Sequence, residues 1–182
     1  MRFRSEWTPR SLTLSKLQEI EQAICAIEAL LSDGASEAAD EQIGVLNETY
    51  GRNEEADLFQ NYEDSMSRTE LALRLSQPEP RPSQHVTRAE LIELVRRIQD
   101  PDYAISALVA PLVVNDIEQS ESAQSEVSSA DQAAFLQEYY LDLLTVNVSL
   151  PGISDLIFWD DLEAEDIVDR ALAYQPIILP PT

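Results

Sequence analysis

The clearest structural signal in the chain is the segment Thr87-Arg-Ala-Glu-Leu-Ile-Glu-Leu-Val-Arg-Arg-Ile98. Thr87 and Glu90 form a capping box, in which each side chain accepts a backbone N–H bond at the start of a helix. The apolar residues that follow recur at helical spacing: Leu91, Ile92, Leu94, Val95 and Ile98. The segment therefore predicts an amphipathic helix that ends before Asp100-Pro101.

Helical spacing continues on both sides of this segment. The further predicted helices cover residues 13–31, 36–51, 53–73, 129–144 and 162–174, with a short helix and a buried extended piece within 104–114 and a short apolar turn at 154–159. Only four glycines are present, which leaves little of the turn chemistry that β-hairpins need. The predicted fold class is all-α.

The segment Gln77-Pro-Glu-Pro-Arg-Pro-Ser-Gln84 has prolines at alternate positions, which excludes a helix and favours an extended chain. We therefore expect two helical halves joined by a Pro-rich linker. The expected organisation is an N-terminal helical region of unknown role at 1–76, the linker at 77–86 and an acidic helical domain at 87–182.

Composition narrows the classes of function. The chain has 182 residues, with 34 Asp and Glu against 12 Lys and Arg, a formal net charge of −22, and 44% hydrophobic residues. That apolar share predicts a folded protein rather than a disordered acidic tail. Its negative field repels phosphate groups, so we expect basic protein partners and neither direct nucleic-acid binding nor binding to anionic membranes.

The sequence indicates a cytoplasmic protein. We find no signal peptide and no apolar run long enough to span a membrane. The single cysteine, Cys25, excludes an internal disulfide framework and favours a reducing compartment; as a lone cysteine on a helix it is expected to be a small buried hydrophobe. No oligomeric state is predicted.

Charge is divided unevenly along the chain. Residues 98–182 hold 16 acidic side chains and one basic side chain, Arg170, a net charge of −15. Ion pairs within this segment cannot neutralise it, so we expect a field that either attracts a cationic partner or serves only to keep the protein in solution.

No motif for catalysis, metal binding or cofactor binding stands out. The only histidine, His85, lies beside the prolines and is expected to be solvated, and the glycines form no phosphate-binding loop. The acidic run at 160–166 lacks the loop glycine and alternating oxygen ligands of a calcium site, so it is expected to be a solvated helix start. We therefore expect no enzyme activity, no metal and no cofactor.

The segment that stands out for binding is Ser154-Asp-Leu-Ile-Phe-Trp159. It places two large aromatic residues on one turn, directly before a run of acids, and interfaces use rigid aromatic residues as anchors. Consecutive side chains on a single turn cannot all point inward, so at least one of Phe158 and Trp159 is expected near the surface.

Residues 151–159, the acids after them and the final helix resemble the third and fourth helices of the colicin and pyocin nuclease immunity proteins. Residues 87–98 are similar to the first helix of that family, and the helix from Ser129 would stand for the second. Phe158 and Trp159 replace a tyrosine pair of the family, the connection at 99–128 is longer, and residues 1–86 have no counterpart.

The resemblance implies a small four-helix bundle that binds and neutralises a cognate nuclease toxin, here a distorted bundle within 87–182. It would place the anchoring contacts on Ser154, Asp155, Phe158, Trp159 and the adjacent Asp160. Specificity would lie on the exposed side of residues 131–142, where the acidic candidates are Glu138 and Asp142.

Three hypotheses about function follow. The first is an acidic inhibitor that captures a basic toxin domain, with electrostatic steering for fast encounter and the aromatic pair for slow dissociation. The second is a DNA mimic that occupies the nucleic-acid channel of an enzyme. The third is a helical adaptor without inhibitory activity, whose charge only keeps it in solution.

Overall fold

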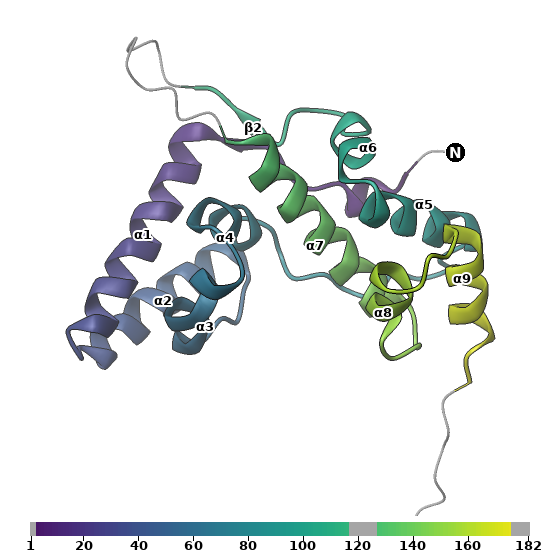
Figure 1. Cartoon of the computed structure of the whole chain (residues 1–182). Helices are drawn as coiled ribbons and strands as arrows, with labels where there is room; N and C mark the ends of the chain where they lie inside the picture. The colour runs from purple at the N-terminus through teal and green to yellow at the C-terminus, as the bar shows by residue number, and fades with distance from the viewer. Residues whose placement is uncertain (1–2, 117–126, 176–182) are drawn as a thin grey trace, which may run out of the picture. The chain divides into compact units, whose positions relative to one another are not determined.

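The computed structural model describes residues 3–116 and 127–175 and is mostly helical, as predicted (Figure 1). The chain divides into two compact units, and each is built from separate segments. Unit 1 comprises Met1–Thr8, Pro80–Ala107 and Leu136–Thr182; unit 2 comprises Pro9–Glu79 and Leu108–Phe135. The domain boundaries predicted from the sequence, after residue 76 and before residue 87, concern which parts of the chain fold independently, and they remain a prediction.

Unit 2 is organised around its longest helix, α1 (Leu14–Ser32), which packs against the three other helices that lie wholly within it. These are α2 (Ser36–Tyr50), α3 (Ala56–Asn61) and α4 (Arg68–Leu75), with a 3-10 turn, η2 (Tyr62–Asp64), between the last two. The buried face of α1 has the spacing seen in its sequence: Leu14, Leu17, Ile20, Ile24 and Ile27. Cys25 falls on the other side of this helix and is exposed, so the expectation that it is buried is wrong.

The predicted helix at 53–73 is interrupted, which corrects the sequence interpretation. After Gly51 ends α2 in the left-handed conformation, the chain forms α3, the 3-10 turn and α4 in succession. Ser67 starts α4 by accepting the backbone N–H of Glu70 at 3.1 Å. This local cap competes with helix continuation, because a side-chain oxygen at this position favours a new helix start.

A two-residue parallel ladder completes unit 2. Strand β1 (Leu12–Thr13) pairs with β2 (Val113–Val114), which confirms an extended piece within 104–114. The expectation that this piece is buried is wrong for β2, because Val113 is half-buried and Val114 is 45% exposed. Asp116 then accepts hydrogen bonds from the backbone and the hydroxyl of Ser15, at 3.0 and 2.5 Å. The carboxylate thus lies at the N-terminus of α1, where the helix dipole stabilises negative charge.

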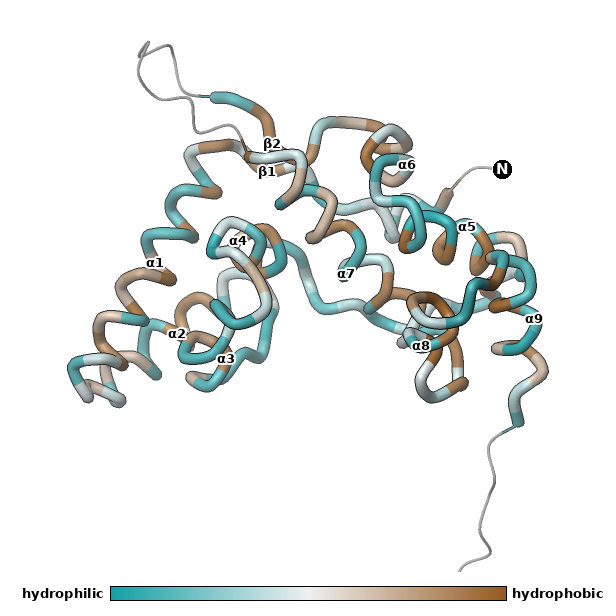
Figure 2. Tube along the Cα trace, viewed as in Figure 1, coloured by the Kyte–Doolittle hydropathy of each residue, from teal (hydrophilic) through white to brown (hydrophobic). Residues whose placement is uncertain are grey.

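Unit 1 is centred on α5 (Arg88–Gln99), the helix predicted from the capping box, and both bonds of that box are present. The unit also holds η1 (Ser5–Trp7), α6 (Pro101–Ser106), α8 (Ile153–Phe158), α9 (Ala164–Ala173) and the part of α7 (Ser129–Asn147) from Leu136 onward. Helix α5 packs against α6, α8 and α9, and α8 packs against α9. Figure 2 shows hydrophobic and hydrophilic residues alternating along α1 and α5, the pattern of amphipathic helices.

The Pro-rich segment 77–86 contains no helix or strand, as expected, but it makes specific contacts. Gln77 is buried and pairs with the backbone of Arg10 through two hydrogen bonds, of 2.8 and 3.2 Å. Ser83 accepts a hydrogen bond from the indole N–H of Trp7 at 2.8 Å. This segment is therefore held to the N-terminal residues rather than being a free spacer.

Among the described residues, no helix has the length and apolar character needed to cross a membrane.

Candidate partner-binding site

Helix α8 carries the candidate anchoring residues, and its start depends on Gly152. This glycine has a φ of 68°, in the left-handed region that side chains disfavour, and it forms the N-cap of the helix. Ile153 and Ile157, one turn apart, are buried. Because they fix the inward face, the residues beside them, Asp155 and Phe158, are directed outward.

Both aromatic residues at the end of α8 are exposed. Phe158 has 46% of its surface accessible and Trp159 has 83%. The expectation that at least one of them remains near the surface is confirmed. An indole ring with this exposure contributes almost nothing to the core of unit 1, because burial requires removal from water.

Asp155 and Trp159 lie one helical turn apart, and the backbone N–H of Trp159 donates to the carbonyl oxygen of Asp155 at 2.9 Å. Residues at this spacing are neighbours on one helix face. Asp155 is exposed and Ser154 is half-buried, so the predicted anchoring residues on α8 and Trp159 at its C-cap are all at least partly accessible.

Several exposed carboxylates lie close to this aromatic pair in the sequence. Asp160 forms a long ion pair of 3.5 Å with Arg170, and both side chains are half exposed. Within the described part of the chain, no ion pair involves the exposed acids Asp155, Asp161, Glu163 or Asp166. We call the group formed by Asp155, Phe158, Trp159, Asp160 and Asp161 the α8 patch.

Where α9 faces α5, by contrast, acidic side chains are paired with arginines. Arg88 donates two hydrogen bonds to Asp169, at 2.6 and 2.9 Å, and Arg96 pairs with Glu165. The hydrogen bonds from Arg88 hold the pKa of Asp169 below its ordinary value. The C-terminal acids are therefore partly neutralised by arginines from before residue 98, which a count within 98–182 cannot reveal.

The two candidates on α7 occupy a different element of unit 1. Glu138 is exposed and Asp142 is half-buried. Their helix is joined to α5 by a buried hydrogen bond from Arg97 to the hydroxyl of Tyr140, at 2.9 Å. A second bond runs from the amide of Gln137 to the carbonyl oxygen of Ile98, at 2.8 Å.

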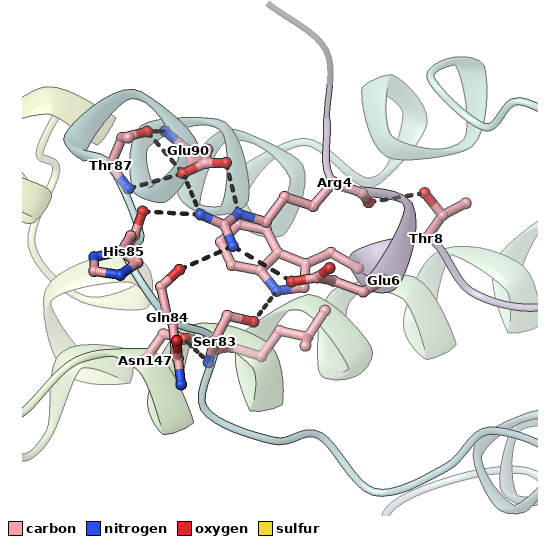
Figure 3. Close-up of polar contacts among 11 residues, drawn as sticks. Arg4, Glu6, Thr8, Ser83, Gln84, His85, Thr87, Glu90 and Asn147 are labelled. Carbon is pink, nitrogen blue, oxygen red and sulfur yellow. Dashed lines mark hydrogen bonds and ion pairs between the residues drawn. The ribbon is translucent and has the colours of Figure 1, made fainter.

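Within unit 1, a polar cluster that was not predicted joins Arg4 to the residues just before α5 and to its first turn (Figure 3). Arg4 donates to both carboxylate oxygens of Glu90, at 2.6 and 3.2 Å, and to the carbonyl oxygens of Gln84 and His85, at 3.1 and 2.9 Å. His85 is exposed, as expected, and has a positive φ of 54°. The hydrogen bond from Arg4, followed by those from Thr87, lowers the pKa of Glu90 to about 2.

Aromatic rings extend this cluster into the unit. The guanidinium of Arg97 lies 3.9 Å from the ring centre of Phe3 and 5.3 Å from that of Tyr140, while that of Arg4 lies 5.1 Å from Trp7. Trp7 is only 1% exposed. Arg4 and Glu90 are more than 80 residues apart in the sequence. Because hydrophobic periodicity reports only on neighbouring residues, it does not reveal this contact.

Other parts of the described chain offer less defined chemistry. A cavity of about 500 Å³ beside α5 is lined by Glu93, Arg96, Arg97, Tyr103 and Glu165 among others, and its charged side chains are paired with one another. A shallower groove lies between α1 and α2, around Val45. In residues 3–116 and 127–175, no three His, Cys, Asp or Glu side chains come together in a way that could hold a metal ion.

Comparison with known proteins gives no relative: no family model, curated protein or solved structure matches this chain.

Proposed function

We propose that unit 1 is a binding module that inhibits a basic protein domain, of the type found in bacteriocin nucleases, by occupying its surface. The observation that supports this proposal is the α8 patch, in which Trp159 is 83% exposed and two exposed acids, Asp155 and Asp161, form no ion pair within the described chain, while Asp160 has only the 3.5 Å pair with Arg170. Adjacent exposed apolar side chains with a polar rim can mark an interaction site, and aromatic anchors dominate the energy of many interfaces.

The two parts of the patch would act at different stages of binding. The carboxylates steer a cationic surface toward the patch and raise the association rate, an effect that salt weakens. Phe158 and Trp159 then lose their exposed surface on contact, which slows dissociation. The module acts by binding and not by catalysis, and we place it in the cytoplasm, where a free Cys25 stays reduced.

We further propose that α5, α7, α8 and α9 correspond in order to the four helices of a distorted bundle. The packing of α5 on α8 and α9 and the α5–α7 hydrogen bonds support this correspondence. The inserted segment between α5 and α7, which includes α6 and β2, accounts for the longer connection.

Substitutions in the patch test the proposal against a toxin encoded beside the gene. Trp159→Ala should weaken binding of that toxin at least tenfold, as for an interface anchor, whereas Asp161→Asn should weaken it by about two- to fivefold, as for a rim charge. Leu172→Ala is a matched control, because Leu172 is an apolar residue of unit 1 that is 55% exposed but lies on α9.

Binding is measured by calorimetry, and inhibition by the residual nuclease activity. If neighbouring toxins neither bind the protein nor are neutralised by it, the inhibitor proposal fails. A DNA mimic would instead compete with DNA and be sensitive to charge reversal across the whole acidic face. An adaptor would bind basic proteins only weakly and release all of them at moderate salt.

A further inference from the structure

In unit 1, two arginine side chains each contact both an aromatic ring and a carboxylate. Arg97 lies over Phe3 at 3.9 Å and pairs with Glu93 at 2.9 Å. Arg4 lies over Trp7 at 5.1 Å and pairs with Glu90 at 2.6 Å. Such stacking is favourable because the negative face of the ring attracts the cation, and the planar guanidinium can donate to a carboxylate at the same time.

The α8 patch has the same two components, aromatic ring and carboxylate, but among the described residues no Arg or Lys lies over the ring of Phe158 or Trp159. Trp159 is the most exposed aromatic residue among those described, and Asp155 lies one turn before it on the same helix face. Neither Phe158 nor Trp159 has a hydroxyl group, so neither can bind a partner as tyrosine does. The aromatic face and the indole N–H are what the pair offers.

One guanidinium of the chain lies at the edge of this patch. Arg170 reaches Asp160 at 3.5 Å, the longest ion-pair distance among the described residues of unit 1, with about half of each side chain exposed. An exposed pair of this length contributes little stability. A stronger guanidinium donor could therefore take its place at Asp160.

We propose that Trp159, Asp155 and Asp160 form a seat for an arginine side chain of the partner, and that Arg170 competes with that arginine for Asp160. The partner is thus a basic protein that presents arginine, rather than lysine, at the centre of the contact. This inference rests on the α8 patch that carries the proposed function, and it names the chemical group that the patch selects.

Two peptides test the selectivity: hexa-arginine and hexa-lysine, which carry the same charge. The full-length protein is titrated at low salt, and the two indole N–H signals are followed by ¹H–¹⁵N NMR. Trp159 should shift, Trp7 should not, and the arginine peptide should bind about two- to fivefold more tightly than the lysine peptide. Equal affinity for the two peptides, or an unmoved Trp159 signal, would overturn the proposal.

Two variants assign the effect to its residues. Trp159→Leu should remove the preference for arginine while the Trp7 signal reports an intact fold; a preference that persists would contradict stacking on Trp159. Arg170→Gln should tighten arginine binding more than Arg10→Gln, which removes the same charge from unit 2 at an exposed position. Equal effects of these two substitutions would exclude Arg170 as a competitor.

The peptide experiment and the toxin experiment can reject the two proposals separately. A preference for arginine without toxin neutralisation would retain the arginine seat and reject the toxin as partner. Neutralisation without a preference for arginine would retain the inhibitor and reject the seat.

Discussion

At the scale of single residues, the two tryptophans show how differently one side-chain type is used. Trp7 is 1% exposed and donates its indole N–H to Ser83, whereas Trp159 is 83% exposed. The first is part of the core of unit 1, and the second contributes to binding in our proposal. Stability and binding measurements should therefore separate them.

We predict that Trp7→Ala lowers the free energy of unfolding by about 3–5 kcal/mol, because a large core ring is lost and a cavity remains. Trp159→Ala should change it by less than about 0.5 kcal/mol, as expected for an exposed site. Urea unfolding monitored by circular dichroism measures both values. Equal losses for the two variants would show that Trp159 is part of the core.

Glu90 makes the stability of unit 1 depend on pH. Its pKa of about 2 in the folded protein lies below the ordinary 4.5, first because Arg4 donates to it. Between these values the folded state binds fewer protons than the unfolded state, so this contribution is fully present above pH 4.5 and is lost as the pH falls toward 2.

Arg4→Gln should therefore lower the free energy of unfolding at pH 7, because the charge-assisted hydrogen bonds from Arg4 to Glu90 are lost. The cost should shrink as the pH falls from 4.5 to 2.5. Unfolding in urea at several pH values tests this, with Arg10→Gln as the control for the change in net charge. A cost that stays constant over that range would contradict the role assigned to Glu90.

At the scale of elements, local patterns predicted most helices, and contacts between distant residues were missed. The capping box of Thr87 and Glu90 and the buried face of α1 follow from spacing of four residues or fewer, so the sequence reveals them. The pairing of β1 with β2 joins residues about 100 positions apart. Nothing in two dipeptides, Leu-Thr and Val-Val, specifies that they pair.

The same holds for the candidate site: its local features could be predicted from the sequence, and its contacts between distant residues could not. Exposure of Trp159 could be inferred because one turn cannot bury every side chain. The pairing of Asp169 with Arg88 and of Glu165 with Arg96 could not, since it depends on how α5 packs against α9. The sequence therefore predicted the aromatic residues of the patch and not which acids near it remain unpaired.

Alanine substitutions at two glycines compare the backbone requirement at the start of α8 with that in the interior of α2. Gly152→Ala should destabilise the protein by about 1 kcal/mol, because the left-handed conformation disfavours a side chain and the new Cβ would lie 3.3 Å from the Asp155 carboxylate. Gly44→Ala in α2, where the new Cβ meets nothing within 4 Å, should stabilise it by about 0.5–1 kcal/mol. Thermal unfolding of both variants measures the two signs, and a stabilising Gly152→Ala would mean that α8 does not require the left-handed start.

At the scale of the whole molecule, the net charge of −22 opposes folding through repulsion between carboxylates. Salt screens this repulsion, since the Debye length falls from about 30 Å at 0.01 M to about 10 Å at 0.1 M ionic strength. We predict that raising sodium chloride from 10 to 300 mM increases the melting temperature by several degrees. A melting temperature that falls over this range would mean that the internal ion pairs outweigh the repulsion.

The division into two discontinuous units has a consequence for biosynthesis. The residues near Arg4 and Trp7 leave the ribosome early, but their contacts lie on residues 83–90 and 140, and the chain between them, 9–79, belongs to the other unit. Unit 2 in turn waits for residues 108–135. Helices α1 to α4 can pack on one another once residue 75 has been made, but unit 2 is complete only after about three quarters of the chain has been translated, and unit 1 later still. Long sequence separations slow folding, so Trp7 waits longest for the residues that bury it.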